Sequence, residues 1–313
     1  MKYRRIGKSG LKISEISLGA WLTYGGTVQQ ETTTDIVAAA IDHGVNFIDI
    51  ADIYSKGAAE EQIGQAIQGR QRSDLVISSK LFWPMSKNVN DRGLSRKHIM
   101  ESVEKSLRRI GTDYLDIYFC HRFDPHTEVE ETVRAIDDLI RQGKILYWGT
   151  SVWSSAQIER AVGLADRFGA YRPIVEQPRY NVIDRHIEED VLGTCEHYGL
   201  GLTVWSPLAQ GLLTGKYRNG APEGSRGATS EWLKEDLKPE NIERVNRLEA
   251  VARDLGVSLS QLALAWVLRL DQVSCAITGA TKVEHVLDNV KASEIELTAE
   301  TIKAIDRALA HKE

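Results

Sequence analysis

Short apolar runs alternate along the chain with longer segments in which apolar residues recur at helical spacing. A hairpin is expected over 3–14, followed by a first strand that ends near Trp21. Seven further strands are predicted over 46–54, 75–82, 114–122, 145–153, 174–181, 202–207 and 274–280. Helices are predicted over 32–43, 59–68, 95–110, 128–142, 155–168, 186–198, 240–270, 283–291 and 298–310. Strand and helix therefore take turns along almost the whole chain.

This alternation predicts the fold class. Alternating strands and helices form a parallel sheet with helices outside, and eight such units in 313 residues suit a closed (β/α)8 TIM barrel. We expect one α/β domain over 1–313, with an N-terminal β-hairpin and extra C-terminal helices. A doubly wound open sheet is the alternative. The barrel is favoured because no GxGxxG motif follows a predicted strand and no linker divides the chain.

Four polar side chains lie at the ends of three consecutive predicted strands. Asp49 interrupts the apolar run over 46–54, and Tyr54 ends it. Lys80 and His121 lie near the ends of the next two strands. Catalytic groups in a barrel come from the carboxyl ends of different strands, and neighbouring strands lie about 5 Å apart. These four side chains are therefore expected to meet in one pocket.

The four groups together suit the delivery of a proton to a carbonyl oxygen. A free phenol has a pKa of about 10, and the Lys80 ammonium is expected to lower the pKa of Tyr54. Asp49 would keep Lys80 charged, and His121 would donate a hydrogen bond to the substrate. Taken singly, Asp49 and Lys80 also suit a structural ion pair, Tyr54 suits packing in a surface loop, and His121 suits a core histidine. Their position at adjacent strand ends favours the functional interpretation.

Carbonyl reduction also needs a hydride, which no side chain supplies, so a nicotinamide cofactor is expected. Candidate contacts for the nicotinamide follow later strands: Ser151, Gln177 and Trp205. Lys216 and Arg226 lie in the long irregular segment 208–238, where their charges suit phosphate groups. The segment 278–282, which contains Gly279, precedes a predicted helix whose N-terminus suits an anion.

The chain resembles the aldo-keto reductase superfamily in motifs that follow one another in order. They are the run 46–54, the segment 57–64, Lys80, the segment 106–116, His121, and the segments 149–151, 177–181, 205–208 and 215–217. The match extends from the hairpin to about residue 292. Residues 18–26 and the Trp205 motif are similar to the potassium-channel beta-subunit branch.

This resemblance implies reduction of an aldehyde or ketone by NADPH in a (β/α)8 barrel. It makes Tyr54 the proton donor, which Asp49 and Lys80 tune, and His121 the residue that orients the carbonyl. The implied cofactor contacts are Trp21, Ser151, Gln177, Trp205, Ser206, Leu208, Gly211, Lys216, Arg226, Gly279, Thr281, His285, Asp288 and Asn289. Among these, Ser206 to Lys216 would hold the pyrophosphate, and Arg226 with Thr281 to Asn289 would hold the adenosine end.

The sequence departs from the resembled branch in four places. His121 stands where the channel subunits carry Asn, so the enzymatic set is complete. Val152 follows Ser151 where a polar residue is common, and His285 stands where Gln is frequent. Thr281 and Lys282 replace the usual Arg near the 2′-phosphate. NADP is still expected over NAD.

The substrate is predicted to be a small carbonyl compound. The expected pocket walls are aromatic, namely Trp21, Tyr24, Trp83 and Phe123, together with the segment 208–238. The oligomeric state stays open, and the resemblance is compatible with a homo-tetramer or a larger ring.

Composition narrows the possible partners. A formal charge of −5 gives no sign of nucleic-acid binding, and without a run of eighteen apolar residues no membrane insertion is expected. Three scattered cysteines and a polar N-terminus suit a reduced, cytoplasmic compartment.

Two other functions compete with the reductase. One is an NADPH-binding redox sensor that regulates a partner protein and turns over slowly. The other is a metal-dependent hydrolase that uses His121, Asp124 and His126, and it is disfavoured because no further ligand cluster is evident.

Overall fold

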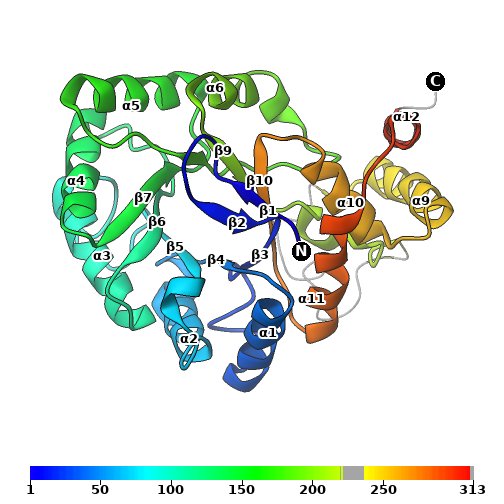
Figure 1. Ribbon diagram of the computed structural model, residues 1–313, viewed down its shortest axis with the longest axis horizontal. Coiled ribbons are helices and arrows are strands. Elements are labelled where there is room, and N and C mark those ends of the chain that lie inside the picture. The colour runs from blue at the N-terminus through cyan, green and yellow to red at the C-terminus, as the bar shows by residue number, and fades with distance from the viewer. Residues whose placement is uncertain (219, 221–235, 311–313) are drawn as a thin grey trace.

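Eight parallel strands close into a barrel in the computed structural model, which describes residues 1–218, 220 and 236–310. The strands are β3 (Ile16–Gly19), β4 (Phe47–Asp49), β5 (Val76–Leu81), β6 (Leu115–Cys120), β7 (Ile145–Thr150), β8 (Val175–Glu176), β9 (Gly201–Val204) and β10 (Val273–Thr278). Each strand pairs with the next, and β10 pairs with β3 to close the ring. The predicted (β/α)8 barrel is confirmed (Figure 1).

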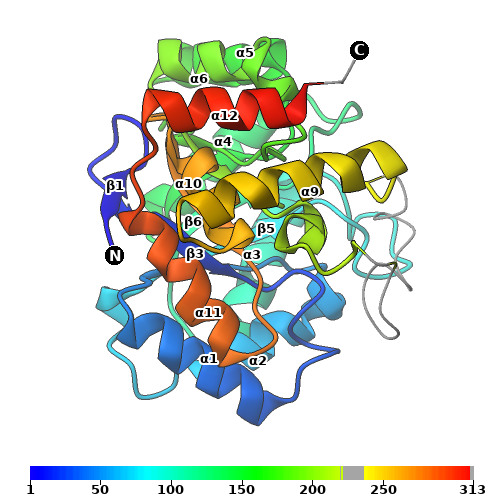
Figure 2. The same cartoon turned by 90° about the vertical axis from the view of Figure 1, so that its right-hand side faces the viewer.

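Helices surround this barrel. They are α1 (Gln30–Asp42), α2 (Ala58–Ala66), α3 (Arg96–Ile110), α4 (Val129–Arg141), α5 (Ser155–Phe168), α6 (Val191–Tyr198), α9 (Pro239–Asp254), α10 (Leu259–Leu268), α11 (Val283–Asn289) and α12 (Ala299–Leu309). Short 3₁₀ turns are η1 (Tyr54–Gly57), η2 (Arg72–Asp74), η3 (His186–Glu188), η4 (Ala209–Thr214) and η5 (Val290–Glu294). Figure 2 shows α9 and α12 packed side by side.

Several helices begin where a side chain can accept hydrogen bonds from the first turn. Ser95 caps α3 by accepting from the His98 amide, and Thr298 caps α12 by accepting from the Thr301 amide. These local signals explain why the predicted starts of both helices agree with the structure to within one residue.

The predicted hairpin is confirmed and covers one end of the barrel (Figure 1). Its strands are β1 (Tyr3–Arg5) and β2 (Lys12–Ser14). Ile6 and Ile13 are fully buried in one cluster with the barrel residues Phe47, Ile117 and Phe119. The hairpin therefore seals the amino-terminal end, and the carboxyl ends of the strands remain for a site.

Several predicted elements differ from those observed, including the following three. Strand β4 ends at Asp49, and Tyr54 begins the turn η1. Strand β8 has only two residues, although the isolated bridge from Arg179 to Trp205 continues its direction. The predicted helix 240–270 is two helices, α9 and α10, at 90° to each other.

The break between α9 and α10 has a local cause. Gly256 adopts a left-handed φ of 70°, which favours glycine. Ser258 then begins α10 with a capping box, in which its hydroxyl and the Gln261 side chain satisfy each other's backbone amides.

In the described part of the chain, no single helix has the length and apolar composition needed to cross a membrane. Only the bent pair α9 and α10 meets that requirement when the two are taken together.

Candidate active site

Lys80 occupies the centre of the predicted site, near the end of β5. Its side chain is 0% exposed, and its ammonium donates three hydrogen bonds. The acceptors are Asp49 Oδ2 at 2.7 Å, the Ile50 carbonyl at 2.8 Å and the Tyr54 hydroxyl at 3.2 Å. Asp49 and Tyr54 both raise the pKa of Lys80 against the opposing effect of burial, so the ammonium stays charged.

Asp49 is buried at the end of β4, and both of its carboxylate oxygens are used. Oδ2 accepts from Lys80, while Oδ1 accepts from Ser78 Oγ at 2.7 Å and from Gln177 Nε2 at 3.0 Å. Ser78 was not predicted as a site residue. It lies two residues before Lys80, and this spacing puts both side chains on the same face of a strand. That spacing is the sequence signal by which Ser78 could have been found.

An unusual backbone holds Tyr54 above Lys80. Ser55 and Lys56 adopt left-handed φ angles of 49° and 53°, and Gly57 follows at 96°. Three such residues in succession are costly for non-glycine side chains, so tertiary contacts must hold the turn. One such contact is the hydrogen bond from Ser55 Oγ to the Tyr24 carbonyl, at 3.2 Å.

Lys80 lowers the pKa of Tyr54 as predicted, but the net pKa of the phenol is raised. Burial raises the pKa of the phenol more than the charge and hydrogen bond of Lys80 lower it. Tyr54 is therefore protonated at neutral pH, which is the form that a proton donor needs. Lys80 reduces the cost of the phenolate without making it the resting form.

His121 directly follows β6, and its ring centroid lies 5.9 Å from that of Tyr54. Burial is the largest cause of a pKa well below the usual value of His121, and the charges of Lys80 and Arg122 add to it. The imidazole is therefore neutral. Its Nδ1 has no hydrogen-bond partner among the described residues. The four predicted side chains thus lie together, as expected from the strand ends.

The predicted nicotinamide contacts gather beside this group of four. Ser151 is buried just after β7, and its Oγ donates to the Gln177 carbonyl at 2.9 Å. Gln177 also reaches Asp49, as described above. The rings of Trp205 and Trp21 meet edge to face with centroids 5.8 Å apart. Hydroxyl, amide and indole groups are thus adjacent, and this donor set fits a planar carboxamide ring.

The predicted phosphate contacts lie on a strained backbone after β9. Ser206, Ala209 and Gln210 all have positive φ, and Gly211 has a φ of 99°. A Cβ at Gly211 would lie 2.8 Å from Lys216 Cε, so the lysine side chain packs across this glycine. Leu208 directly precedes η4.

Cationic groups meet at the same end of the site. Burial and then the charges of Lys216 and Lys282 lower the pKa of His285, so these three groups are neighbours. No acidic side chain lies within ion-pair distance of either lysine among residues 1–218, 220 and 236–310. Two lysines without an ion-pair partner among the described residues fit phosphate groups.

The remaining predicted cofactor residues are placed as follows. Gly279 directly follows β10, and the hydroxyl of Thr281 lies 3.4 Å from His285 Nδ1. Asp288 accepts from Ser258 and Gln261 and so ties α11 to the start of α10. Asn289 is buried at the end of α11. Arg226 lies outside the described residues. Cofactor contacts of these residues stay predictions.

The predicted aromatic walls are only partly supported. Trp83 lies 6.3 Å from the His121 ring, and Phe123 packs edge to face on Trp153 at 5.1 Å. Tyr24 differs because its side chain is 1% exposed in the hydrophobic core. Its predicted place on an open wall is not supported; it instead supports the turn that carries Tyr54.

The competing metal site finds no support. Among the described residues, no group of three or more His, Cys, Asp or Glu side chains is arranged to hold a metal ion. Asp124 instead accepts hydrogen bonds from the Leu94 amide, the His126 amide and the Thr127 hydroxyl. Its carboxylate thereby shapes a loop.

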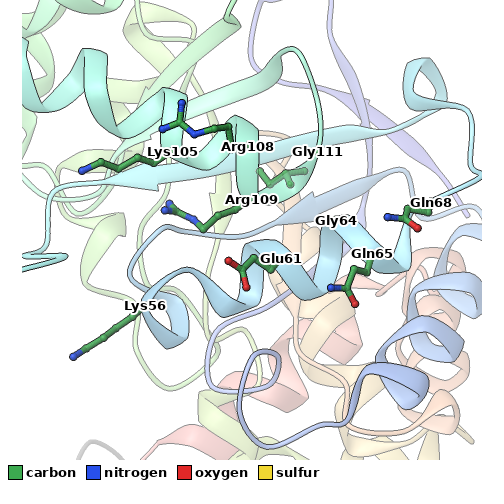
Figure 3. A pocket seen from close by; sticks show the side chains of 10 residues that line it. Lys56, Glu61, Gly64, Gln65, Gln68, Lys105, Arg108, Arg109 and Gly111 are labelled. Atoms are coloured by element: carbon green, nitrogen blue, oxygen red, sulfur yellow. The ribbon is translucent and has the colours of Figure 1, made fainter.

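A separate groove of about 660 Å³ lies between α2 and α3, on the outside of the barrel (Figure 3). Lys56, Lys105, Arg108 and Arg109 line it together with Glu61. Two of the cations are neutralised, because Lys105 pairs with Asp91 and Arg109 pairs with Glu60. None of the four predicted catalytic side chains lines this groove.

Comparison with known proteins agrees with this architecture. The aldo/keto reductase family model matches residues 15–310. A protein of Arabidopsis thaliana described as a probable voltage-gated potassium channel subunit beta is 47% identical over 302 residues, covering 94% of this chain and 92% of the relative. A protein of Oryza sativa subsp. japonica with the same description is 46% identical over 321 residues, covering 100% and 98%. The resemblance to the channel beta-subunit branch is thus confirmed, and the chain belongs to the aldo/keto reductase family.

Proposed function

We propose that this protein reduces an aldehyde or ketone to an alcohol, with NADPH as the hydride source and Tyr54 as the proton donor. Membership of the aldo/keto reductase family supports oxidoreduction in general. The observation that carries the specific proposal is the chain of contacts from Asp49 through Lys80 to the Tyr54 hydroxyl, at 2.7 Å and 3.2 Å. It is the arrangement by which a half-buried phenol can release a proton.

In the proposed reaction, the carbonyl oxygen lies between the Tyr54 hydroxyl and the His121 ring. A bound NADPH would provide the hydride for the carbonyl carbon. Tyr54 would give its proton to the carbonyl oxygen at the same time, so that the products would be NADP+ and the alcohol. His121 is neutral and carries one N–H, which donates a hydrogen bond to the same oxygen. Solvent then returns a proton to Tyr54.

Lys80 and Asp49 act through Tyr54. The ammonium stabilises the phenolate that forms when the proton leaves, because opposite charges attract strongly where water is excluded. Asp49 balances the charge of Lys80 before the reaction, and Ser78 and Gln177 fix the direction of the carboxylate. The group is thus arranged before the substrate arrives.

Ser151, Gln177, Trp21 and Trp205 would hold the nicotinamide end of the cofactor. Lys216, Lys282 and the neighbouring His285 would hold phosphate oxygens. Two lysines without an acidic partner in the described residues favour NADPH over NADH, since the 2′-phosphate adds negative charge.

A redox-sensing subunit is the second candidate. It is supported by the description of two relatives as probable potassium channel beta subunits. Such a protein would bind NADPH as tightly as a reductase but would turn over slowly. Only repeated turnover separates the two functions.

The test is NADPH oxidation, followed by absorbance, over a panel of aldehydes, ketones and sugars, with NADH in parallel. The reductase proposal expects many turnovers per protein molecule with at least one class, and a preference for NADPH. A single turnover followed by a stop would favour the sensor. Activity that survives a chelator would also exclude the metal-dependent alternative.

A further inference from the structure

Arg122, the residue after His121, lies at the same strand ends but has no part in the mechanism above. It is half-buried. Its Nη1 donates to the His121 carbonyl at 2.5 Å and to Ser151 Oγ at 3.4 Å. The guanidinium carbon lies 5.8 Å from the centre of the Trp83 ring. Arg122 is therefore held among residues from both the predicted catalytic group and the predicted pocket wall.

The charge of Arg122 reaches the reacting groups. It lowers the pKa of His121, and it opposes the burial that raises the pKa of Tyr54. The effect is mutual, since Tyr54 also acts on Arg122. The guanidinium consequently lies near the place where the substrate carbonyl would bind.

No acidic side chain pairs with Arg122 within the described ranges. Other partly buried arginines of this chain do have such partners: Arg109 pairs with Glu60, and Arg179 pairs with Asp236. The carboxylate that acts on Arg122 from a distance is Glu176, whose oxygens already accept from Thr150 and Val152.

Arg122 also has hydrogen-bond donors that are not used. A guanidinium has five N–H groups in a planar fork. All of the hydrogen bonds found for Arg122 among the described residues use Nη1, which leaves Nε and Nη2 unused. Burial lowers the pKa of Arg122, which means that keeping its charge there costs free energy. In the described part of the chain, no side chain offsets this cost through an ion pair. An anionic ligand would provide both the missing charge and the missing acceptors.

We propose that Arg122 binds an anionic group of the substrate, a carboxylate or a phosphate, and so selects carbonyl compounds that carry such a group a few bonds from the reacting carbon. The inference rests on the proposed reduction and names its substrate class. Bidentate hydrogen bonding is the geometry in which arginine recognises both kinds of anion. Arg122 is a specificity residue in this account, and Tyr54 remains the proton donor.

Matched substrate pairs test the proposal. One pair is 4-oxobutanoate and its uncharged methyl ester, and the other is glyceraldehyde 3-phosphate and glyceraldehyde. The wild-type protein is expected to have the higher kcat/KM for the anion of at least one pair, and which pair responds distinguishes carboxylate from phosphate. Arg122→Gln is expected to lower the preference for the anion, which is the ratio of its kcat/KM to that of its neutral partner, on the order of 10- to 100-fold, mainly through the KM for the anion.

Two further variants control this result. Arg122→Lys keeps the charge but not the fork, so a partial recovery for the anion is expected. Arg108→Gln removes an exposed arginine of the outer groove (Figure 3) and should leave both substrates of each pair unaffected.

The outcomes separate the two claims. If the wild-type protein turned over all four compounds without preferring an anion, or if Arg122→Gln slowed both members of a pair equally, the role of Arg122 would be overturned while the reduction stood. The role of Arg122 would also be overturned if an increase in the Kd for NADPH accounted for the whole loss of kcat/KM in Arg122→Gln, because Arg122 would then be a cofactor residue. If no carbonyl compound were turned over by the wild-type protein, the proposed reduction would fail, and the role of Arg122 with it.

Discussion

At the scale of single residues, the site depends on one buried ammonium. Lys80 donates to Asp49, Ile50 and Tyr54, and it has no exposed surface. An ion pair of this kind adds little stability over an apolar pair but is costly to break from one side. Its presence under Tyr54 is therefore better explained by proton chemistry than by stability.

Replacing Lys80 with Met is expected to lower kcat by at least about 100-fold, because the Tyr54 phenolate loses its stabilising charge. The same change leaves the Asp49 carboxylate buried without its cation and should lower the free energy of unfolding by about 3 kcal/mol. Steady-state kinetics across pH and urea denaturation measure the two effects.

The double variant Asp49→Asn with Lys80→Met provides the control. It removes both charges, so stability should largely return while the rate stays low. An unchanged rate and pH profile in Lys80→Met would count against the role of the ammonium.

Asp52 lies three residues after Asp49 but differs from it in its surroundings. It is fully buried, its Oδ2 accepts from Ser102 at 3.2 Å, and its Oδ1 has no partner among the described residues. Burial and the nearby Glu60 carboxylate raise the pKa of Asp52 from 3.8 to about 8. Because the folded value lies above the unfolded one, the stabilising contribution is complete below the unfolded pKa and is lost as pH rises to about 8.

Asp52→Asn should mimic the protonated acid. The variant should therefore gain stability over the wild type as pH rises. The difference between their free energies of unfolding should be larger at about pH 8.5 than at about pH 5, by on the order of 3 kcal/mol. Urea denaturation at both pH values measures this difference. A difference that stayed constant with pH would mean that Asp52 is ionised in the folded protein.

The site residues differ in how far the sequence could predict them. Asp49, Tyr54, Lys80 and His121 were accessible because strand ends in a barrel converge. The net pKa of Tyr54 could not be predicted, because the extent of its burial depends on the tertiary structure around it. Tyr24 was misplaced for the same reason, because an aromatic residue near a strand end suits a pocket wall and a core equally well.

At the scale of elements, short local signals decided the boundaries. The sequence predicted one helix over 240–270, whereas Gly256 and the capping box of Ser258 divide it into α9 and α10. Both signals could be read from the sequence. The early end of β4 could not be read from the sequence. The amides of Ile50 and Asp52 still donate hydrogen bonds to the carbonyls of Ser78 and Lys80, so the chain keeps running beside β5 after the strand ends.

Ser258 also links α10 to α11, because its hydroxyl donates to Asp288 at 2.9 Å and accepts from the Gln261 amide at 3.1 Å. Ser258→Ala is expected to lower the free energy of unfolding by about 1 kcal/mol through the lost cap. Thermal or urea denaturation measures it. Ser258→Thr keeps the hydroxyl, so its free energy of unfolding should fall by less. Equal decreases in the two variants would argue against the cap.

At the scale of the whole molecule, the barrel has one sealed and one functional end. The hairpin buries Ile6 and Ile13 against the strands, whereas the opposite end carries the four converging side chains. The alternation of strand and helix was sufficient to predict the barrel, its hairpin and the end that bears the site. It could not give the substrate, because the shape of a pocket depends on loops that follow no repeating pattern.

Cofactor binding should stabilise the folded chain as a whole, because the predicted contacts follow β3 and β7 to β10 and also lie on α11. At 100 times its Kd, NADPH is expected to raise the free energy of unfolding by about 2.7 kcal/mol. NADH at the same concentration should raise the melting temperature less, and Lys282→Ala should reduce the difference between the two. Lys303→Ala, an exposed change on α12, is the matched control.

Tyr54→Phe is the most direct test of the central claim, because it removes one hydroxyl and keeps the ring. Single-turnover NADPH oxidation with the best aldehyde, measured beside NADPH binding, separates chemistry from cofactor affinity. We predict a rate at least about 100-fold below that of the wild type, with a Kd for NADPH that changes by less than about twofold. A rate close to that of the wild type would contradict the assignment of Tyr54 as the proton donor.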